Sequence, residues 1–401
     1  MFAPALRRSA LGEVRQSPRF LALMLVMLVA AIGYGGRDVS RLRYTTELTG
    51  DALGIGVAAA VFAVGLALGG LASGPITDRF DPRRLLVAGM ALQGVMSLLT
   101  ALMLLGGVTS DGAYLARFLV DGVFACACVP ALATTQAAMV PTGARGAAEI
   151  ISILRLGIGV ALGLMLSGLS PSPGVTLIGV GVVLCLVAVP IALITRPVAI
   201  PTRGKDSGRV LDALKTHPVL RRVVVADLVL CVAVPTQFAN VILASDWEES
   251  LVTPVLVSGV LGVLVGRLTL SLTGSHGVVR AELLRSYGTF VALALLGIPL
   301  VATSVVYTDV WIPAAVLFVG SATTAYAQGL LAALVQQQVP DEVRGRLTGG
   351  MAAARSLLIA GSAILLTAVV VPLSATGAAV FVALLGVMAL VVLRGFRGVT
   401  A

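Results

Sequence analysis

The segment between residues 74 and 84 reads Gly74-Pro75-Ile76-Thr77-Asp78-Arg79-Phe80-Asp81-Pro82-Arg83-Arg84. Its charged residues separate two long apolar runs, which we place at residues 51–73 and 84–106. Each run is close to the ~20 residues that an α-helix needs to cross a lipid bilayer. The segment therefore predicts a short polar turn that joins two membrane-spanning helices.

The composition of the whole chain agrees with this interpretation. Of its 401 residues, 58% are hydrophobic and 12% are charged, whereas soluble proteins average about 45–50% apolar and about 25% charged residues. Such a chain has too little polar surface to cover a water-soluble globule, so we predict an all-α integral membrane protein. The four cysteines lie inside apolar runs, and no disulfide, metal site or cofactor is expected.

Twelve apolar stretches are long enough to cross the membrane as helices. The longest polar interval inside the chain follows the sixth stretch. It predicts an N-terminal six-helix half (residues 1–197), a cytoplasmic linker (198–220) and a C-terminal six-helix half (221–401). We place the stretches at residues 19–37, 51–73, 84–106, 112–139, 147–169, 174–195, 222–244, 251–272, 286–305, 310–337, 348–370 and 374–393.

The basic residues are unevenly distributed between alternate loops. With a cytoplasmic N-terminus, 21 of the 28 Lys and Arg residues fall on the cytoplasmic side. Three (Arg37, Arg41 and Arg43) fall in an outer loop, and four lie inside spans. Because cytoplasmic loops of membrane proteins are rich in Lys and Arg, we expect a multi-pass plasma-membrane protein with both termini in the cytoplasm. The net charge of +9 then reflects topology, and no nucleic-acid partner is expected.

An internal repeat relates the two halves. The segment Val140-Pro141-Thr142-Gly143-Ala144-Arg145-Gly146 recurs 199 positions later as Val339-Pro340-Asp341-Glu342-Val343-Arg344-Gly345. Both copies lie between the fourth and fifth spans of their half, and each precedes an arginine inside the next span, Arg155 or Arg355. Two halves in the same orientation are parallel repeats, related by an axis along the membrane normal.

The segment from Gly74 to Arg84 resembles the loop between the second and third helices of the major facilitator superfamily. The resemblance implies the twelve-helix fold of that family and a loop that latches the two halves in the outward-facing state; a loop that only holds positive charge inside is the alternative. The equivalent loop of the second half, which contains Leu270 and Ser271, lacks the charges. Asp81 and Pro82 depart from the family pattern, and the matching residues are Gly74, Asp78, Arg79, Arg83 and Arg84.

Pairs of glycines four residues apart occur in the second and fifth spans. They are Gly65/Gly69 and Gly70/Gly74 in the second span and Gly159/Gly163 in the fifth. Small residues at this spacing let the backbones of membrane helices approach closely. The resemblance implies that these two spans pack across the interface between the halves. The fifth span has no Gly-Pro, which disfavours the drug/proton antiporter group of the family.

Charged side chains inside the predicted spans are the main candidates for function, because a charge at the bilayer centre needs a cavity or a partner. Arg117 and Asp121 lie four residues apart and hence on one helix face. We assign Asp121 as a proton-titrating acid, with Arg117 as its partner or as a substrate contact and Asp227 as a second acid. A permanent structural ion pair is the alternative. Spans three, six, nine and twelve hold no charge beyond Arg84 at the cytoplasmic boundary of the third, as the resemblance implies for lipid-facing helices.

The surplus of positive charge inside the membrane points to an anionic or zwitterionic substrate. The alternative for Arg155 and Arg355 is that each neutralises a neighbouring carboxylate such as Asp121, Glu149 or Asp227. Arg37 and Asp38, near the outer end of the first span, are interpreted as exposed loop charges, with an outer gate as the alternative. The residues assigned to a substrate cavity are Arg155, Arg355, Arg267, Gln237, Asn240, Tyr326 and Gln328.

These features predict a secondary active transporter that moves a small molecule by alternating access. The sequence has no nucleotide-binding loop, so we expect an ion gradient as the energy source, and the embedded carboxylates favour protons. The compact size and short outer loops resemble those of bacterial efflux members of the family, which implies export of a drug-like, amphiphilic or anionic compound. A monomer in the bilayer is expected. A uniporter or an importer of a small metabolite is the alternative. An intramembrane enzyme is a remote alternative, since the two histidines, His217 and His276, lie in loops. A non-transporting sensor or scaffold is a second remote alternative.

Overall fold

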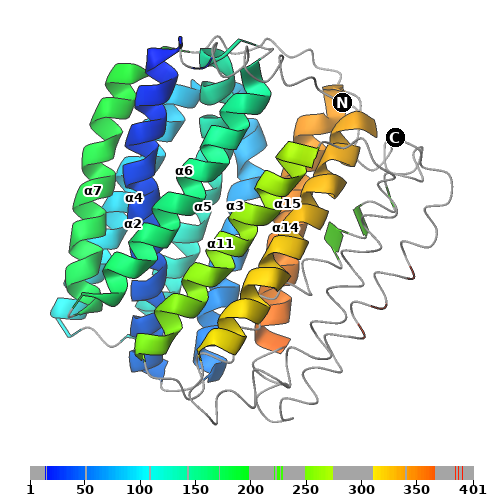
Figure 1. Ribbon diagram of the computed structural model, residues 1–401. Coiled ribbons are helices and arrows are strands. Elements are labelled where there is room, and N and C mark those ends of the chain that lie inside the picture. The colour runs from blue at the N-terminus through cyan, green and yellow to red at the C-terminus, as the bar shows by residue number, and fades with distance from the viewer. Residues whose placement is uncertain are drawn as a thin grey trace. The chain divides into compact units, whose positions relative to one another are not determined.

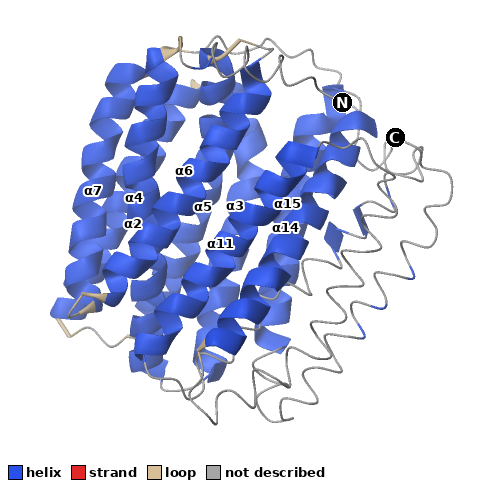
Figure 2. Cartoon of the chain, in the orientation of Figure 1, coloured by secondary structure: helices blue, strands red, loops and turns tan. Residues whose placement is uncertain are grey.

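The computed structural model describes residues 16–49, 52–107, 110–141, 144–170, 172–197, 249–273, 310–338 and 341–365, with single positions elsewhere that include Asp227. The described part of the chain is helical and contains no strand (Figure 2). Its helices, labelled in Figure 1, are α2 (Pro18–Thr49), α3 (Ala52–Arg79), α4 (Pro82–Leu105), α5 (Asp111–Met139), α6 (Arg145–Gly168), α7 (Pro173–Ile194), α11 (Glu249–Thr273), α14 (Trp311–Gln338) and α15 (Asp341–Leu365).

Nine of the twelve predicted spans coincide with these helices. The first predicted span, 19–37, is too short, because α2 continues as a helix to Thr49. Seven stretches among the described residues are long and apolar enough to cross a membrane. The predicted spans at 222–244, 286–305 and 374–393 lie outside the continuously described segments.

The polar turn between α3 and α4 is organised by the two residues that depart from the family pattern. The carboxylate of Asp81 accepts a hydrogen bond of 3.0 Å from the backbone amide of Arg83, and Pro82 is the first residue of α4. Aspartate at the N-cap and proline at the first helical position are both favoured helix starts. The turn therefore fixes the beginning of the third span.

The chain divides into two compact units, one of residues 1–48 and 61–203 and the other of residues 49–60 and 204–401. In the first unit α4 packs along α7 and α5. The buried face of α4 includes polar side chains, Gln93, Ser97 and Thr100. The opposite face of α4 and one face of α7 expose large apolar side chains every three or four residues. In α4 these are Leu92, Val95, Leu99 and Leu102, and in α7 they are Ile178, Val182, Leu186, Val189 and Leu193. A surface more apolar than the interior suits helices that face lipid.

Glycines let neighbouring helices of the first unit touch through their backbones. A Cβ atom at Gly65 of α3 would lie 2.2 Å from the carbonyl oxygen of Leu119 in α5, and one at Gly163 of α6 would lie 2.0 Å from that of Ile32 in α2. No side chain fits at such distances. These close approaches join helices within the first unit, and the packing of spans two and five across the halves stays a prediction.

The same approach recurs in the second unit. Gly262 and Gly266 of α11 face the carbonyl oxygens of Phe318 and Ala322 in α14, and a Cβ atom added to either glycine would lie 2.2 or 2.1 Å from the facing oxygen. These glycines follow their counterparts in α3 by 197 positions, and the facing residues follow theirs in α5 by 199. The two halves therefore share a helix-packing motif, as an internal repeat requires.

Candidate functional site

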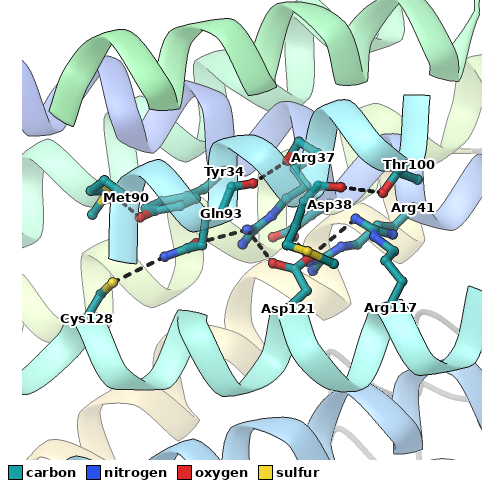
Figure 3. A network of polar contacts seen from close by, with 12 residues as sticks. Tyr34, Arg37, Asp38, Arg41, Met90, Gln93, Thr100, Arg117, Asp121 and Cys128 are labelled. Carbon is teal, nitrogen blue, oxygen red and sulfur yellow. Dashed lines mark hydrogen bonds and ion pairs between the residues drawn. The ribbon is translucent and has the colours of Figure 1, made fainter. Parts of the chain in front are cut away.

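A buried carboxylate in the first unit is surrounded by three guanidinium groups (Figure 3). The Oδ1 atom of Asp121 lies 3.1 Å from Nη1 of Arg37, and its Oδ2 atom lies 3.3 Å from Nη2 of Arg117. Arg41 also forms an ion pair with Oδ2. We call these four residues the Asp121 cluster; the Asp121 side chain is 0% exposed and the arginine side chains are at most 9% exposed.

Helix periodicity explains why these residues meet. Arg37 and Arg41 are one turn apart on α2, and Arg117 and Asp121 are one turn apart on α5, so each pair shares a helix face. At ~1.5 Å per residue, Asp121 lies about 15 Å along α5 from its first residue. The cluster therefore lies well inside the helical bundle of the first unit.

A second layer of contacts orients the arginines. Arg37 donates a hydrogen bond of 2.9 Å to Oε1 of Gln93 on α4, and the Gln93 amide donates to Sγ of Cys128 at 3.3 Å. The Arg41 guanidinium lies 4.4 Å from the ring centroid of Phe62, and that of Arg117 lies 5.1 Å from the ring centroid of Phe118. Arginine stacked on aromatic rings is held in a fixed orientation.

The charge of the cluster is not balanced. Three guanidinium groups face Asp121, and within the described part of the chain one further carboxylate pairs with them, that of Asp38, which lies 3.4 Å from Arg41 with its side chain 55% exposed. Among the described residues, the Nε atoms of all three arginines and Nη1 of Arg117 have no hydrogen-bond acceptor. A buried donor without a partner costs about 1–3 kcal/mol, and more when it is charged. The cluster thus has one surplus positive charge and several free donors.

The second unit contains a simpler charged site. Arg355 of α15 donates from Nε to Oδ2 of Asp227 at 2.5 Å and from Nη2 to Oδ1 at 2.7 Å. Arg267 of α11 lies within electrostatic range of the same carboxylate. Asp227 is fully buried. The geometry matches the alternative in which Arg355 neutralises a neighbouring carboxylate.

Arg155, the counterpart of Arg355, makes a different contact. It is 8% exposed and donates a hydrogen bond of 2.9 Å from Nη1 to the backbone carbonyl of Met27 on α2. Glu149, one of its expected partners, is exposed. Among the described residues, the Nε atom of Arg155 has no acceptor. Among the described residues, no carboxylate therefore neutralises the positive charge of Arg155.

The other predicted cavity residues are less closely grouped. Tyr326 and Gln328 are half-buried on α14. Residues two positions apart on an α-helix differ by about 200° in direction, so these two side chains leave opposite sides of the helix. Gln237 and Asn240 lie outside the described residues.

The predicted latch residues lie at the turn between α3 and α4. Arg83 donates from its guanidinium to the carbonyl oxygen of Ala192 near the end of α7, and Arg84 is exposed. The latch positions Gly74, Asp78 and Arg79 lie within the last turns of α3, where only the backbone is described.

The interpretation of Arg37, Arg41 and Arg43 as outer-loop residues is wrong. All three lie in α2, where Arg37 and Arg41 are buried and Arg43 donates a hydrogen bond of 3.1 Å to the carbonyl of Ser170. The polar residues after position 37 lower the local hydropathy, so hydropathy alone predicts that the helix ends there, although α2 continues to Thr49. The four-residue spacing of Arg37 and Arg41, which matches that of Arg117 and Asp121, was a signal for a shared charged site.

The long helices with lipid-type surfaces, their buried charges and their repeated packing define a polytopic membrane protein. The sequence profile of the Major Facilitator Superfamily matches residues 20–363. The chain belongs to this superfamily, and it is accordingly an integral membrane protein that moves a small molecule across a lipid bilayer.

Solved structures of transporters have the same fold. The nucleoside transporter NupG matches with a TM-score of 0.69 and 13% identity over 95% of this chain and 100% of its own. The human organic anion transporter MFSD10 (TETRAN) matches with a TM-score of 0.67 and 13% identity over 94% and 99%. A bacterial homologue of the human lysosomal transporter Spinster matches with a TM-score of 0.63 and 13% identity over 95% and 97%. No curated protein is significantly similar to this chain in sequence.

Proposed function

We propose that this protein is a proton-coupled secondary active transporter in which Asp121 exchanges the coupling proton. The observation that carries the proposal is a fully buried carboxylate shared by three arginines from two helices. A substrate or a helix movement that draws an arginine away changes the charge next to Asp121, and hence its tendency to bind a proton. Asp227, held by Arg355, is the second candidate acid.

The proposed substrate is a small anionic or amphiphilic compound. The surplus positive charge of the Asp121 cluster and the carbonyl-bonded Arg155 support an anion. One structural neighbour is described as an organic anion transporter and another as a nucleoside transporter, but identities of 13% show the fold alone. The substrate class therefore rests on the charges of this chain.

The direction of transport depends on how substrate and proton bind. Export driven by an inward proton gradient requires that they bind in turn, whereas joint binding drives uptake. Export is the direction that the short outer loops predict. The remaining proposals are a plasma-membrane location, a monomer without enzymatic activity, cytoplasmic termini, and a latch at Gly74, Asp78, Arg79, Arg83 and Arg84. The excess of basic residues on one side of the spans supports the cytoplasmic termini.

The test is flux into proteoliposomes with an imposed pH gradient. Substrates are first selected by a thermal-shift ligand screen on the purified protein. Asp121→Asn is expected to abolish accumulation driven by the pH gradient while leaving exchange of labelled for unlabelled substrate intact. Glu149→Gln is the matched control, because it removes an exposed carboxylate on α6 that no contact joins to either site among the described residues.

The alternative of a structural ion pair gives a different result. If Asp121 only supports packing, Asp121→Asn lowers gradient-driven accumulation and exchange by the same factor and also lowers the melting temperature. Full gradient-driven accumulation in both Asp121→Asn and Asp227→Asn contradicts the proposed proton coupling.

A further inference from the structure

We infer that Arg37, Arg41 and Arg117 form a binding site for a small organic monoanion, and that this anion and a proton bind there together. The inference rests on the proposed function for the role of Asp121 in proton coupling, and it differs from it in direction, because joint binding drives uptake. Arg37 and Arg41 enter it through the structure, which places them inside the first unit.

The charges and the free donors of the cluster define the ligand. With Asp38 and Asp121 both ionised, the three arginines leave one positive charge uncompensated. Guanidinium groups bind carboxylates through paired N–H donors. The donors left without an acceptor in the described segments, Nε of each arginine and Nη1 of Arg117, are buried. A carboxylate supplies one negative charge, and its two oxygens accept hydrogen bonds from donors of this kind.

The surroundings favour an organic anion over a hydrated inorganic ion. The rings of Phe62, Tyr114 and Phe118 lie against the guanidinium groups of Arg41 and Arg117. Such walls match an apolar body attached to a carboxylate. The Asp38 side chain, which pairs with Arg41, is 55% exposed, so we expect the ligand to approach the cluster from this side.

The coupling follows from competition for the same arginines. Ionised Asp121 occupies the groups that the ligand needs, whereas protonated Asp121 leaves them without a counter-ion. Protonation therefore favours anion binding, and by reciprocity anion binding takes up a proton. With an inward proton gradient this linkage drives uptake rather than the predicted export. The groups that contact Asp121 are Arg37 and Arg41 of α2 and Arg117 of α5. The groups that contact these arginines are Tyr34 and Asp38 of α2, Phe62 of α3, Gln93 of α4, and Tyr114 and Phe118 of α5.

The experiment compares benzoate with its neutral isostere benzamide on the purified full-length protein. Affinity is measured by isothermal titration at mildly acidic and mildly alkaline pH. Benzoate is expected to bind, and to bind more tightly at lower pH by up to about tenfold per pH unit, the limit for one linked proton. Proton uptake on binding, followed with a pH indicator in weak buffer, is the reciprocal measurement.

Variants separate the site from general effects on folding. Asp121→Asn is expected to bind benzoate more tightly than the wild type and without pH dependence, a gain that misfolding cannot produce. Arg41→Gln is expected to lose benzoate binding. Arg43→Gln is the matched control on the same helix, because Arg43 bonds the carbonyl of Ser170 and not Asp121.

Three results overturn the inference: no benzoate binding by the wild type at acidic pH, equal binding of benzamide, or no gain of affinity in Asp121→Asn. The proposed function is tested separately by flux. If Asp121→Asn loses gradient-driven accumulation of a screened substrate while benzoate binding shows no pH dependence, the proposed function stands and the inference fails. If benzoate behaves as expected but no flux responds to a pH gradient, the site stands and the proposed proton-driven transport fails.

Discussion

Arg155 and Arg355 occupy matching positions in the two halves but have different partners. Each bonds a residue 128 positions earlier in the chain. Arg355 donates two hydrogen bonds to the carboxylate of Asp227, whereas Arg155 donates one to the backbone carbonyl of Met27. Both halves thus have the arginine and its contact with the residue 128 positions earlier, but the hydrogen-bond acceptor is a carbonyl in one half and a carboxylate in the other.

The difference determines where charge remains inside the membrane. A carboxylate neutralises a buried guanidinium, but a carbonyl oxygen supplies only a dipole. The first unit therefore retains the charge of Arg155 in addition to the surplus of the Asp121 cluster. In the second unit the charge of Arg355 is paired with the carboxylate of Asp227. We conclude that, among the described residues, the halves share a helix-packing motif and that Arg155 and Arg355 differ in electrostatic environment.

The largest expected effect comes from breaking the pair in the second unit. Asp227→Ala leaves Arg355 without the carboxylate of this pair. Because the Arg355 side chain is 28% exposed, we expect the free energy of unfolding to fall by about 3 kcal/mol, the lower end of the range for breaking a buried pair. Adding Arg355→Met should restore most of this loss, because an apolar pair of similar volume is tolerated. Thermal unfolding in detergent measures both variants.

The matching substitution in the first unit is the control for that prediction. Arg155→Met removes one hydrogen bond to a carbonyl and no ion pair, so we expect a loss of about 1 kcal/mol. If Arg155→Met and Asp227→Ala lower stability equally, the two sites are electrostatically alike and the comparison fails.

The next largest effect tests the equivalence of the halves in packing. Gly65→Ala and Gly262→Ala each place a Cβ atom 2.2 Å from a carbonyl oxygen of the facing helix. The helices must separate, at a cost of about 1–3 kcal/mol, as for other overpacked positions.

Gly179→Ala is the matched control for the two packing glycines. Nothing lies within 4 Å of its added Cβ atom, so we expect no loss and a gain of up to about 1 kcal/mol in helix propensity. Unequal losses at positions 65 and 262 in the same unfolding assay would contradict the shared packing motif.

Much of the fold could be predicted from the sequence because apolar length and charge asymmetry are local signals. Nine predicted spans match described helices, and the family follows from the segment at Gly74 to Arg84. The pairing of Arg117 with Asp121 also follows from spacing along one helix. These features depend on neighbours within a few turns.

Only the Arg117–Asp121 pair of the charged site could be predicted, because the part contributed by Arg37 and Arg41 depends on tertiary contacts. The buried part of α2 beyond residue 37 is polar, and a charged segment at the end of an apolar run resembles a loop. Arg37 and Arg41 can be buried because three other helices supply their partners. Asp121 pairs with both arginines, Gln93 accepts a hydrogen bond from Arg37, and the ring of Phe62 stacks on Arg41. No pattern within α2 specifies those partners.

The smallest expected effect compares the two arginines at constant charge. Arg355→Lys loses the two-point contact with Asp227, because an ammonium group cannot reproduce the planar fork of a guanidinium. We expect a loss of about 1 kcal/mol. Arg155→Lys keeps a donor for the single carbonyl of Met27, so a loss of about 0.5 kcal/mol or less is expected. The measurement is the difference between the two variants in the unfolding assay, and a larger loss in Arg155→Lys would show that the carbonyl contact of the first unit is the more demanding of the two.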